Sequence, residues 1–338
     1  MSGYSILQRD ARLDFMRALG TLTIIVPHVL SPDLLVQIRT FDVVMLVFVS
    51  GMSYAYQAVA GGIYGYGQYI KKRFKKLVLP TWMLIFIVFC SMNAASLVLS
   101  KGLYFDIADL CSSLLLFEDG IGYVWIIKVY LGMAIVAPFL WKVVNRVENG
   151  ILFFGLCGVV YLIYHYMYVL LRQVSLPILS IILEEYIFYI VAYMIPFAIG
   201  MYFCRHRDRK IVSLLFLFLF ICIQLYVVFQ KGGFFPNHYK YPPELYYLSY
   251  GIACSVVIYH VAPTGSNSIV AWLSKNSLTF YLVHVFWVIW LSAIANSFQV
   301  QILNLFYVKF ILVVVLTAAT VLAVHKIQIF YKEYKNSK

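Results

Sequence analysis

The chain consists of long apolar stretches separated by short polar segments. The stretches lie near residues 12–30, 40–60, 77–99, 121–144, 150–171, 183–204, 211–230, 245–263, 276–297 and 302–325. A helix of about 20 apolar residues is long enough to cross the hydrocarbon core of a bilayer, which is about 30 Å thick. The pattern therefore predicts an all-α polytopic membrane protein, a bundle of about ten transmembrane helices.

Composition agrees with this class. Of the 338 residues, 63% are apolar and 12% are charged, which excludes a soluble globular protein. The apolar stretches use nearly the whole chain, so we predict one membrane-embedded domain over residues 1–338 and no separate soluble domain. Any chemistry must then take place within the helical bundle or at its rim.

The distribution of basic residues predicts the orientation in the membrane. With the N-terminus in the cytoplasm, nineteen Lys and Arg residues fall in cytoplasmic segments and five in outer segments, as the excess of positive charge in cytoplasmic loops requires. Ten crossings then return the C-terminus to the cytoplasm. The net charge of +12 follows from this orientation, and we expect no nucleic-acid partner.

The first apolar stretch contains two ionisable residues, Arg17 and His28. Eleven residues correspond to about three helical turns, so both side chains lie on one face, about 16 Å apart along the axis. Ionisable groups are costly inside a bilayer, and this pair therefore indicates a functional site. The alternative is that Arg17 extends to the lipid headgroups and His28 only forms a hydrogen bond at the opposite interface.

Two neighbours extend this site. Pro27 cannot donate a hydrogen bond to the carbonyl of Thr23, which predicts a kinked helix and favours a cavity, not lipid, around His28. Asp14 stands three residues before Arg17, where an ion pair can form and orient the guanidinium. A simple interfacial salt bridge is the alternative for this pair. Histidine suits general-base catalysis because its ordinary pKa lies near neutrality.

Further polar and aromatic residues are candidates for binding. The segment KKRFKKLVLP holds Lys72, Arg73 and Lys76, which either follow the rule for cytoplasmic charge or bind phosphates of a cytosolic donor. Lys128 and His284 lie inside apolar stretches, although a lone membrane histidine more often bonds to a neighbouring helix. The six cysteines show neither paired metal-ligand spacing nor a disulfide framework, and the sequence predicts no metal site.

Aromatic residues are abundant, at 18% of the chain with 28 tyrosines, and the outer segment 231–251 is rich in them. Aromatic rings stack on sugars and phenol hydroxyls bond to them, although the same residues also pack ordinary membrane helices. We therefore count Tyr241 of this segment and Trp125 among the candidate substrate-binding residues, with Lys128 and His284. The pair Pro242-Pro243 predicts that a new helix begins near Glu244.

The combined pattern resembles the membrane-bound acyltransferase family 3, bacterial O-acyltransferases that modify surface polysaccharides. LDFMRALGTLTIIVPHV fits the family motif Arg-x10-His with Arg17 and His28 in register, and FDVVMLVFVSGMSYAY resembles its second-helix pattern with Ser50 and Gly51. The likeness continues through KKRFKKLVLPTW, GYVWIIKVYL, IPFAIGMYF and LSKNSLTFYLVH, and covers essentially the whole chain. The family often has Arg-x-x-Arg at the basic segment, where this chain has Arg73 and Lys76.

The resemblance implies a single ten-helix acyltransferase domain in the bacterial cytoplasmic membrane. It implies an O-acyltransferase, most often an O-acetyltransferase, that uses acetyl-CoA or another acyl-CoA and a hydroxyl of a surface or lipid-linked glycan. His28 would be the general base or a transient acyl carrier, Arg17 would position the donor, and Arg73 would hold donor phosphates. A transporter or exporter of glycan remains the alternative function, although the chain lacks the internal repeat common in transporters. Membrane lipids are expected partners, and a homo-oligomer is compatible with the sequence.

Overall fold

Helices make up all of the regular structure in the described part of the chain. The computed structural model describes residues 10–62, 65–117, 120–121, 123–171, 181–206 and 209–336. Their elements are α1 (Ala11–Thr23), η1 (Val26–His28), α2 (Asp33–Arg39), α3 (Asp42–Val59), α4 (Tyr66–Val98), α5 (Ile107–Leu114), α6 (Ile126–Arg146), α7 (Gly150–Leu171), η2 (Leu183–Ile187), α9 (Phe188–Arg205), α10 (Arg209–Lys231), η3 (Pro236–Tyr239), α11 (Leu245–Val261), α12 (Ser268–Lys275), α13 (Ser277–Phe298), η4 (Gln301–Asn304) and α14 (Phe306–Asn336).

Eight helical segments of the described chain are long and apolar enough to cross a membrane, so the protein is a polytopic membrane protein. Two of the ten predicted crossings differ. The stretch 12–30 forms α1, an α-helix of 13 residues, and the stretch 245–263 forms α11, with 17 residues. Thirteen residues rise only about 20 Å, less than the hydrocarbon thickness. The reason is local, since Pro27 lies just beyond α1, and α11 lies between Pro243 and Pro263.

The end of α1 has the irregular backbone that Pro27 predicts. The α-helix stops at Thr23, and residues Val26–His28 form one tighter 3-10 turn instead of a continuation to residue 30. His28 therefore stands beyond the end of the α-helix that carries Arg17. The irregular backbone expected at Pro27 is present, but the prediction of a single kinked helix over 12–30 is wrong, because the α-helix ends at Thr23.

Helix α4 begins earlier than the predicted stretch 77–99. It starts at Tyr66 and includes the whole basic segment, with Pro80 inside the helix. The apolar pattern gave no sign of this extension because the first three turns are polar and basic. As a result Arg73 and Lys76 lie about one turn apart on a single helix.

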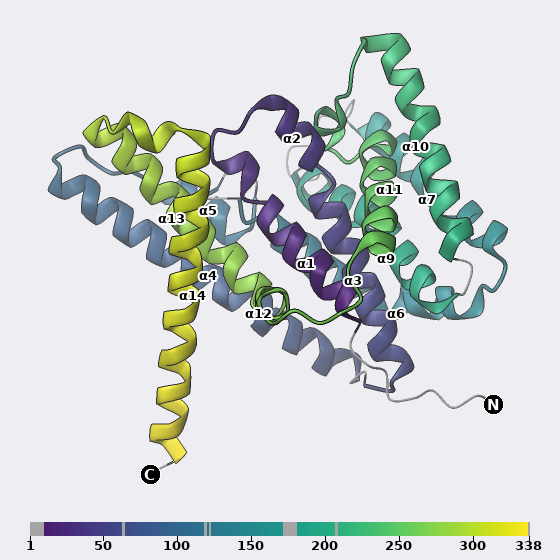
Figure 1. Cartoon of the computed structure of the whole chain (residues 1–338), viewed down its shortest axis with the longest axis horizontal. Coiled ribbons are helices and arrows are strands. Elements are labelled where there is room, and N and C mark those ends of the chain that lie inside the picture. The colour runs from purple at the N-terminus through teal and green to yellow at the C-terminus, as the bar shows by residue number, and fades with distance from the viewer. Residues whose placement is uncertain are drawn as a thin grey trace.

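The centre of the molecule is the crossing of α3 and α9, the most extensive contact between helices. Figure 1 shows α1 and α3 in the middle, with α4, α13 and α14 on one side and α7, α10 and α11 on the other. A side chain at Gly51 or Gly200 would meet backbone, because a Cβ would lie 2.0 Å from the Phe197 carbonyl oxygen or 2.1 Å from that of Phe48. Small residues therefore bring the two backbones together, as in many membrane helix pairs.

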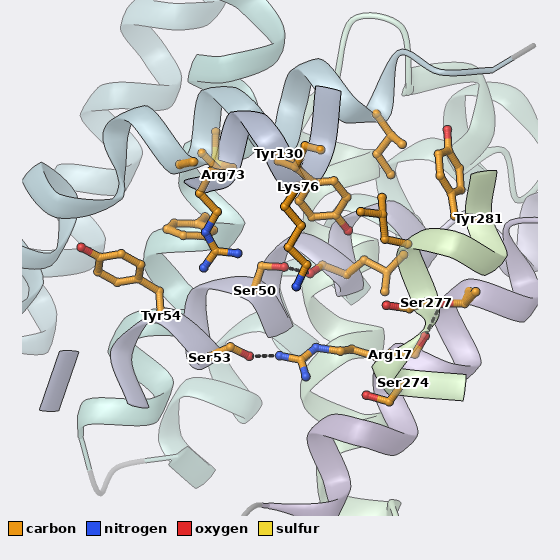
Figure 2. A pocket seen from close by; sticks show the side chains of 18 of the residues that line it. Arg17, Ser50, Ser53, Tyr54, Arg73, Lys76, Tyr130, Ser274, Ser277 and Tyr281 are labelled. Carbon is orange, nitrogen blue, oxygen red and sulfur yellow. Dashed lines mark hydrogen bonds between the residues drawn. The ribbon is translucent and has the colours of Figure 1, made fainter. Parts of the chain in front are cut away.

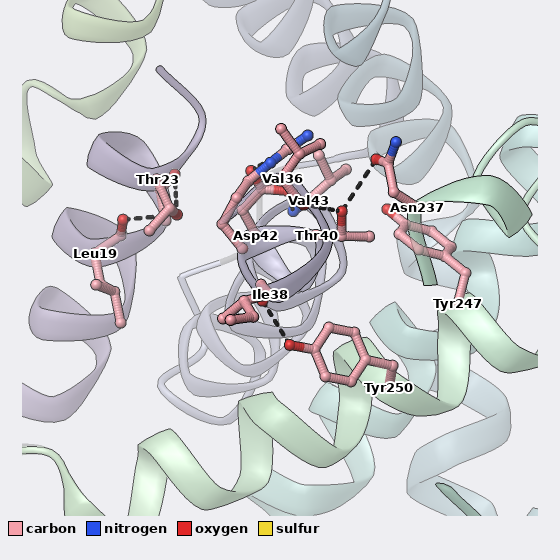
Figure 3. Close-up of polar contacts among 12 residues, drawn as sticks. Leu19, Thr23, Val36, Ile38, Thr40, Asp42, Val43, Asn237, Tyr247 and Tyr250 are labelled. Carbon is pink, nitrogen blue, oxygen red and sulfur yellow. Dashed lines mark hydrogen bonds and ion pairs between the residues drawn. The ribbon is translucent and has the colours of Figure 1, made fainter. Parts of the chain in front are cut away.

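Hydrogen bonds fix the segment between α1 and α3. Thr40 bonds to Asn237 at 3.0 Å, and the Tyr250 hydroxyl donates to the carbonyl of Ile38, which ties α2 to η3 and α11 (Figure 3). Arg39 and Asp42 form a buried ion pair at 2.7 Å. Helix α11 begins at Leu245, next to Glu244, as the proline pair predicts. The turn that carries His28 is thus connected to a well-anchored segment.

Candidate functional site

A cavity of about 410 Å³ lies between α1, α3, α4, α6, α9, α12 and α13. We call it the Arg17 cavity. Its cationic lining residues are Arg17, Arg73, Lys76 and Lys275, and among the described residues that line it none is Asp or Glu. Figure 2 shows Arg73 and Lys76 projecting from α4 toward the space beside Ser50 and Arg17. Four cations around one cavity favour an anionic ligand, and guanidinium groups suit phosphates.

Arg17 belongs to a chain of polar contacts that links α1, α3 and α12. Its Nη2 donates to the Ser53 hydroxyl of α3, and its Nη1 lies 3.9 Å from Asp14 Oδ1. Asp14 in turn accepts a hydrogen bond of 2.7 Å from the Ser274 hydroxyl of α12. The predicted Asp14–Arg17 pair is therefore present, and it forms inside the bundle, since the Asp14 side chain is only 8% exposed. This arrangement fixes the guanidinium at the cavity wall.

Two of the three candidate residues of the basic segment line the Arg17 cavity. Arg73 and Lys76 line it, and the Arg73 guanidinium lies 5.1 Å from the ring centre of Tyr69, another lining residue. Lys72 is exposed and is not among the lining residues. The contact of Lys72 with phosphates of the acyl donor stays a prediction. Helical geometry explains the difference, because consecutive residues point about 100° apart around the axis.

His28 lies one turn beyond the cavity. Ile24 on the same segment lines the cavity and precedes His28 by four residues, and Tyr281 on α13 lines it and precedes His284 by three. The His28 ring packs against Tyr123, with ring centroids 3.8 Å apart, and against His284, at 5.7 Å. The imidazole is half-buried against these two rings and is not among the residues that line the Arg17 cavity, so the predicted cavity around His28 stays a prediction.

Tyr123 is a neighbour of His28 that the sequence did not single out. It lies just before α6 with a positive φ of 58°, a conformation that few residues other than glycine adopt, and its carbonyl accepts a hydrogen bond from the Tyr281 hydroxyl. The Tyr123 side chain is 42% exposed, and its partial burial raises the pKa of a phenol that is already neutral at physiological pH. In the sequence, the one feature that could have indicated Tyr123 as a site residue is its position two residues before Trp125.

Three of the four predicted substrate-binding residues, Trp125, Lys128 and Tyr241, lie in a second group with Tyr189 and Lys240, and we call these five residues the Trp125 cluster; the fourth, His284, lies beside His28. The ring of Trp125 lies 5.6 Å from that of Tyr189 and 5.5 Å from that of Tyr241. Lys240 Nζ lies 5.3 Å from the Trp125 ring centre and 5.1 Å from that of Tyr241. The structure therefore brings Trp125 and Tyr241 together, and adds Lys240 and Tyr189, which the sequence did not indicate.

Lys128 is also part of the Trp125 cluster. It is 4% exposed, forms an ion pair with Glu185, and its Nζ lies 4.7 Å from the ring centre of Tyr189. A buried ammonium with a carboxylate partner is satisfied within the protein, so its predicted contact with substrate stays a prediction. Within the described residues no group of three or more His, Cys, Asp or Glu side chains could hold a metal ion.

Comparison with known proteins identifies the family. Searches among curated proteins and among solved structures gave no match to this chain. A family model described as an acyltransferase domain matches residues 10–324, which include the Arg17 cavity, His28, His284 and the Trp125 cluster. Because this match covers nearly all of the sequence, the chain belongs to the acyltransferase 3 family of membrane-bound proteins.

Proposed function

We propose that the protein is an O-acyltransferase, of the O-acetyltransferase type, which moves an acyl group from cytosolic acyl-CoA to a hydroxyl of a surface or lipid-linked glycan. Family membership indicates acyltransferase activity. The observation that carries the finer proposal is the Arg17 cavity, with four cations and no acidic lining residue among those described, one helical turn from His28. The negative charge of the coenzyme A phosphates is complementary to the positive charge of these four residues.

The proposed topology places the cavity toward the cytosol and His28 toward the outer side of a bacterial cytoplasmic membrane, with both termini in the cytoplasm. The charge asymmetry of the loops supports this orientation. In this proposal α1 and α11 complete a ten-helix bundle as short helices, and residues 1–338 act as one domain. Donor and acceptor then reach the reaction centre from opposite sides.

In the proposed reaction His28 acts as the general base. It removes the hydrogen of the acceptor hydroxyl while the hydroxyl oxygen bonds to the thioester carbonyl carbon. The carbon–sulfur bond breaks, and the proton passes from His28 to the coenzyme A sulfur. Arg17, Arg73 and Lys76 hold the donor phosphates, which leaves the acyl end to pass Ile24 and Tyr281 on its way to His28. General-base assistance of this kind is worth about 10²- to 10⁴-fold in rate.

The Trp125 cluster is the proposed acceptor region. Tyr241 is 48% exposed, whereas Trp125 is 8% exposed, so the cluster presents an accessible aromatic edge backed by buried rings. Aromatic faces and phenol hydroxyls bind sugars by stacking and hydrogen bonds. His28 is connected to this region through the short stretch between Tyr123 and Trp125.

The test uses the full chain in sealed vesicles with labelled acetyl-CoA on the cytoplasmic side. We expect label in ester linkage on glycan, and we expect His28→Ala to remove at least 99% of it at an unchanged melting temperature. His165→Ala is the matched control, because His165 stacks on Tyr161 of α7, away from the cavity. Full labelling by His28→Ala contradicts the mechanism, and glycan movement across the vesicle membrane without coenzyme A supports the transporter instead.

A further inference from the structure

His284 has one ring nitrogen in use and one unused. The side chain is fully buried at 0% exposure, and its Nδ1–H donates to the carbonyl of Tyr281, three residues earlier on α13. A carbonyl only accepts, so Nδ1 carries the hydrogen and Nε2 keeps its lone pair. Nε2 is buried and has no hydrogen-bond partner among the described residues.

An unused buried acceptor is unfavourable. Burying such a nitrogen removes its hydrogen bond to water, and without a protein partner no new hydrogen bond replaces it. Native proteins therefore rarely contain a buried polar atom without a partner. Apolar neighbours would serve packing better, since the next residues on this face of α13, Phe280 and Val288, are buried apolar side chains. A polar atom kept at this position indicates that something bonds to it during the working cycle.

His28 is the group positioned to do so. Its ring centroid lies 5.7 Å from that of His284, at an interplanar angle of 28°. Two imidazoles joined in line by one N–H···N hydrogen bond have centroids about 5.3 Å apart, since each nitrogen lies about 1.2 Å from its ring centre and the bond is about 2.9 Å long. The observed separation is close to this value but the two rings are stacked, so the bond forms when the His28 ring turns about its side-chain bonds and points an N–H at Nε2. The structure records ring contacts for His28 and no side-chain hydrogen bond to any described residue.

We propose that His284 is the positioning residue of His28: its Nε2 accepts a hydrogen bond from a ring N–H of His28 and so keeps the other His28 nitrogen unprotonated toward the acceptor hydroxyl. This inference rests on the proposed role of His28 as general base. Two ring nitrogens are chemically distinct, and the bond made by one decides which of them carries the hydrogen.

The same contact acts during the transfer. When His28 takes the hydroxyl hydrogen it becomes an imidazolium with two N–H groups, one of which donates to His284 Nε2 while the other holds the transferred proton. That proton then passes to the coenzyme A sulfur as the carbon–sulfur bond breaks, and His28 returns to its starting tautomer. His284 stays neutral throughout and exchanges no proton. A hydrogen bond to a charged group is stronger than one between neutral groups. His284 therefore stabilises the imidazolium form of His28.

The first experiment compares His284→Gln with His284→Met. The two replacements have similar length, but only Gln ends in a strong acceptor that can take the place of Nε2. We expect His284→Gln to keep kcat within about 5-fold of the unaltered protein, and His284→Met to lower kcat by about 10- to 100-fold with an unchanged KM for acyl-CoA. Both variants should keep the melting temperature. An unaltered kcat in His284→Met, or an equal loss in both variants, overturns the proposal.

The second experiment needs no substrate and therefore separates this inference from the proposed function. Nitrogen-15 spectra of histidine-labelled protein in bilayers report the tautomer of each ring, and the His28 signals are those absent from His28→Ala. We expect a single His28 tautomer in the unaltered protein and in His284→Gln, and both tautomers in His284→Met. A mixture in the unaltered protein, or one tautomer in all three, overturns the role of His284. Loss of acyl transfer to every glycan tested, with the expected spectra, contradicts the proposed function alone.

Discussion

The crossing of α3 and α9 gives a prediction whose size follows from the geometry. An added Cβ at Gly200 would lie 2.1 Å from the carbonyl oxygen of Phe48, whereas real Cβ contacts essentially never fall below 3.0 Å. The obstructing atom belongs to backbone and cannot rotate away. Gly200→Ala must therefore separate the helices by about 1 Å, a gap that forfeits up to about half of the dispersion energy at the contact.

We expect Gly200→Ala to lower the free energy of unfolding by about 3 kcal/mol, the upper part of the usual range for overpacking. Gly51→Ala should cost about the same, because its Cβ would lie 2.0 Å from the carbonyl oxygen of Phe197. One separation of the helices relieves both clashes. The double variant should therefore lose about 3–4 kcal/mol instead of about 6, a strong coupling between neighbouring sites.

The assay is unfolding in mixed micelles by SDS titration, followed by intrinsic fluorescence. Gly155→Ala and Gly158→Ala on α7 are the matched controls, since nothing lies within 4 Å of a Cβ at either position. Alanine is the better helix former, so these controls should keep or gain up to about 1 kcal/mol. A stable Gly200→Ala, or strictly additive losses in the double variant, would refute the close backbone contact as the reason for these glycines.

The remaining predictions concern the Arg17 cavity and one acidic residue. If Arg17 binds the donor as proposed, Arg17→Lys removes the planar guanidinium that bonds to Ser53 and can hold a phosphate, so KM for acyl-CoA should rise about 10-fold. The control Arg146→Lys, at an exposed site on α6, should leave KM unchanged, and equal KM values for both variants would exclude Arg17 from donor binding. Lys76→Arg restores the Arg-x-x-Arg spacing at the cavity wall, and we expect a KM for acyl-CoA that is about 2- to 5-fold lower; an unchanged KM would show that the donor phosphates lie elsewhere. Burial raises the pKa of the Glu244 carboxyl, so the folded state binds a proton more readily than the unfolded state, and stability should fall as pH rises above the ordinary carboxyl pKa of 4.5. Glu244→Gln should remove that part of the pH dependence of the melting temperature, and identical slopes for the two proteins would contradict it.

The sequence by itself determined the class of protein and the local features. Apolar length predicts most of the crossing helices because backbone groups in a bilayer must bond within their own segment. Pro27 predicts the end of α1, and the spacing of Asp14 and Arg17 predicts their ion pair, since both effects act within about one turn. The family resemblance, carried by short fragments in the right order, is confirmed over residues 10–324.

Only the tertiary structure decided which of these residues meet. Arg17 bonds to Ser53 of α3, and His28 lies beside His284 of α13, because packing of whole helix faces brings together positions that are far apart along the chain. Apolar length alone overestimated the first and eighth stretches as full crossings, because it sets an upper limit on helix length and prolines end α1 and bound α11 within that limit. Periodicity reports the faces of single helices, and shape complementarity selects their partners.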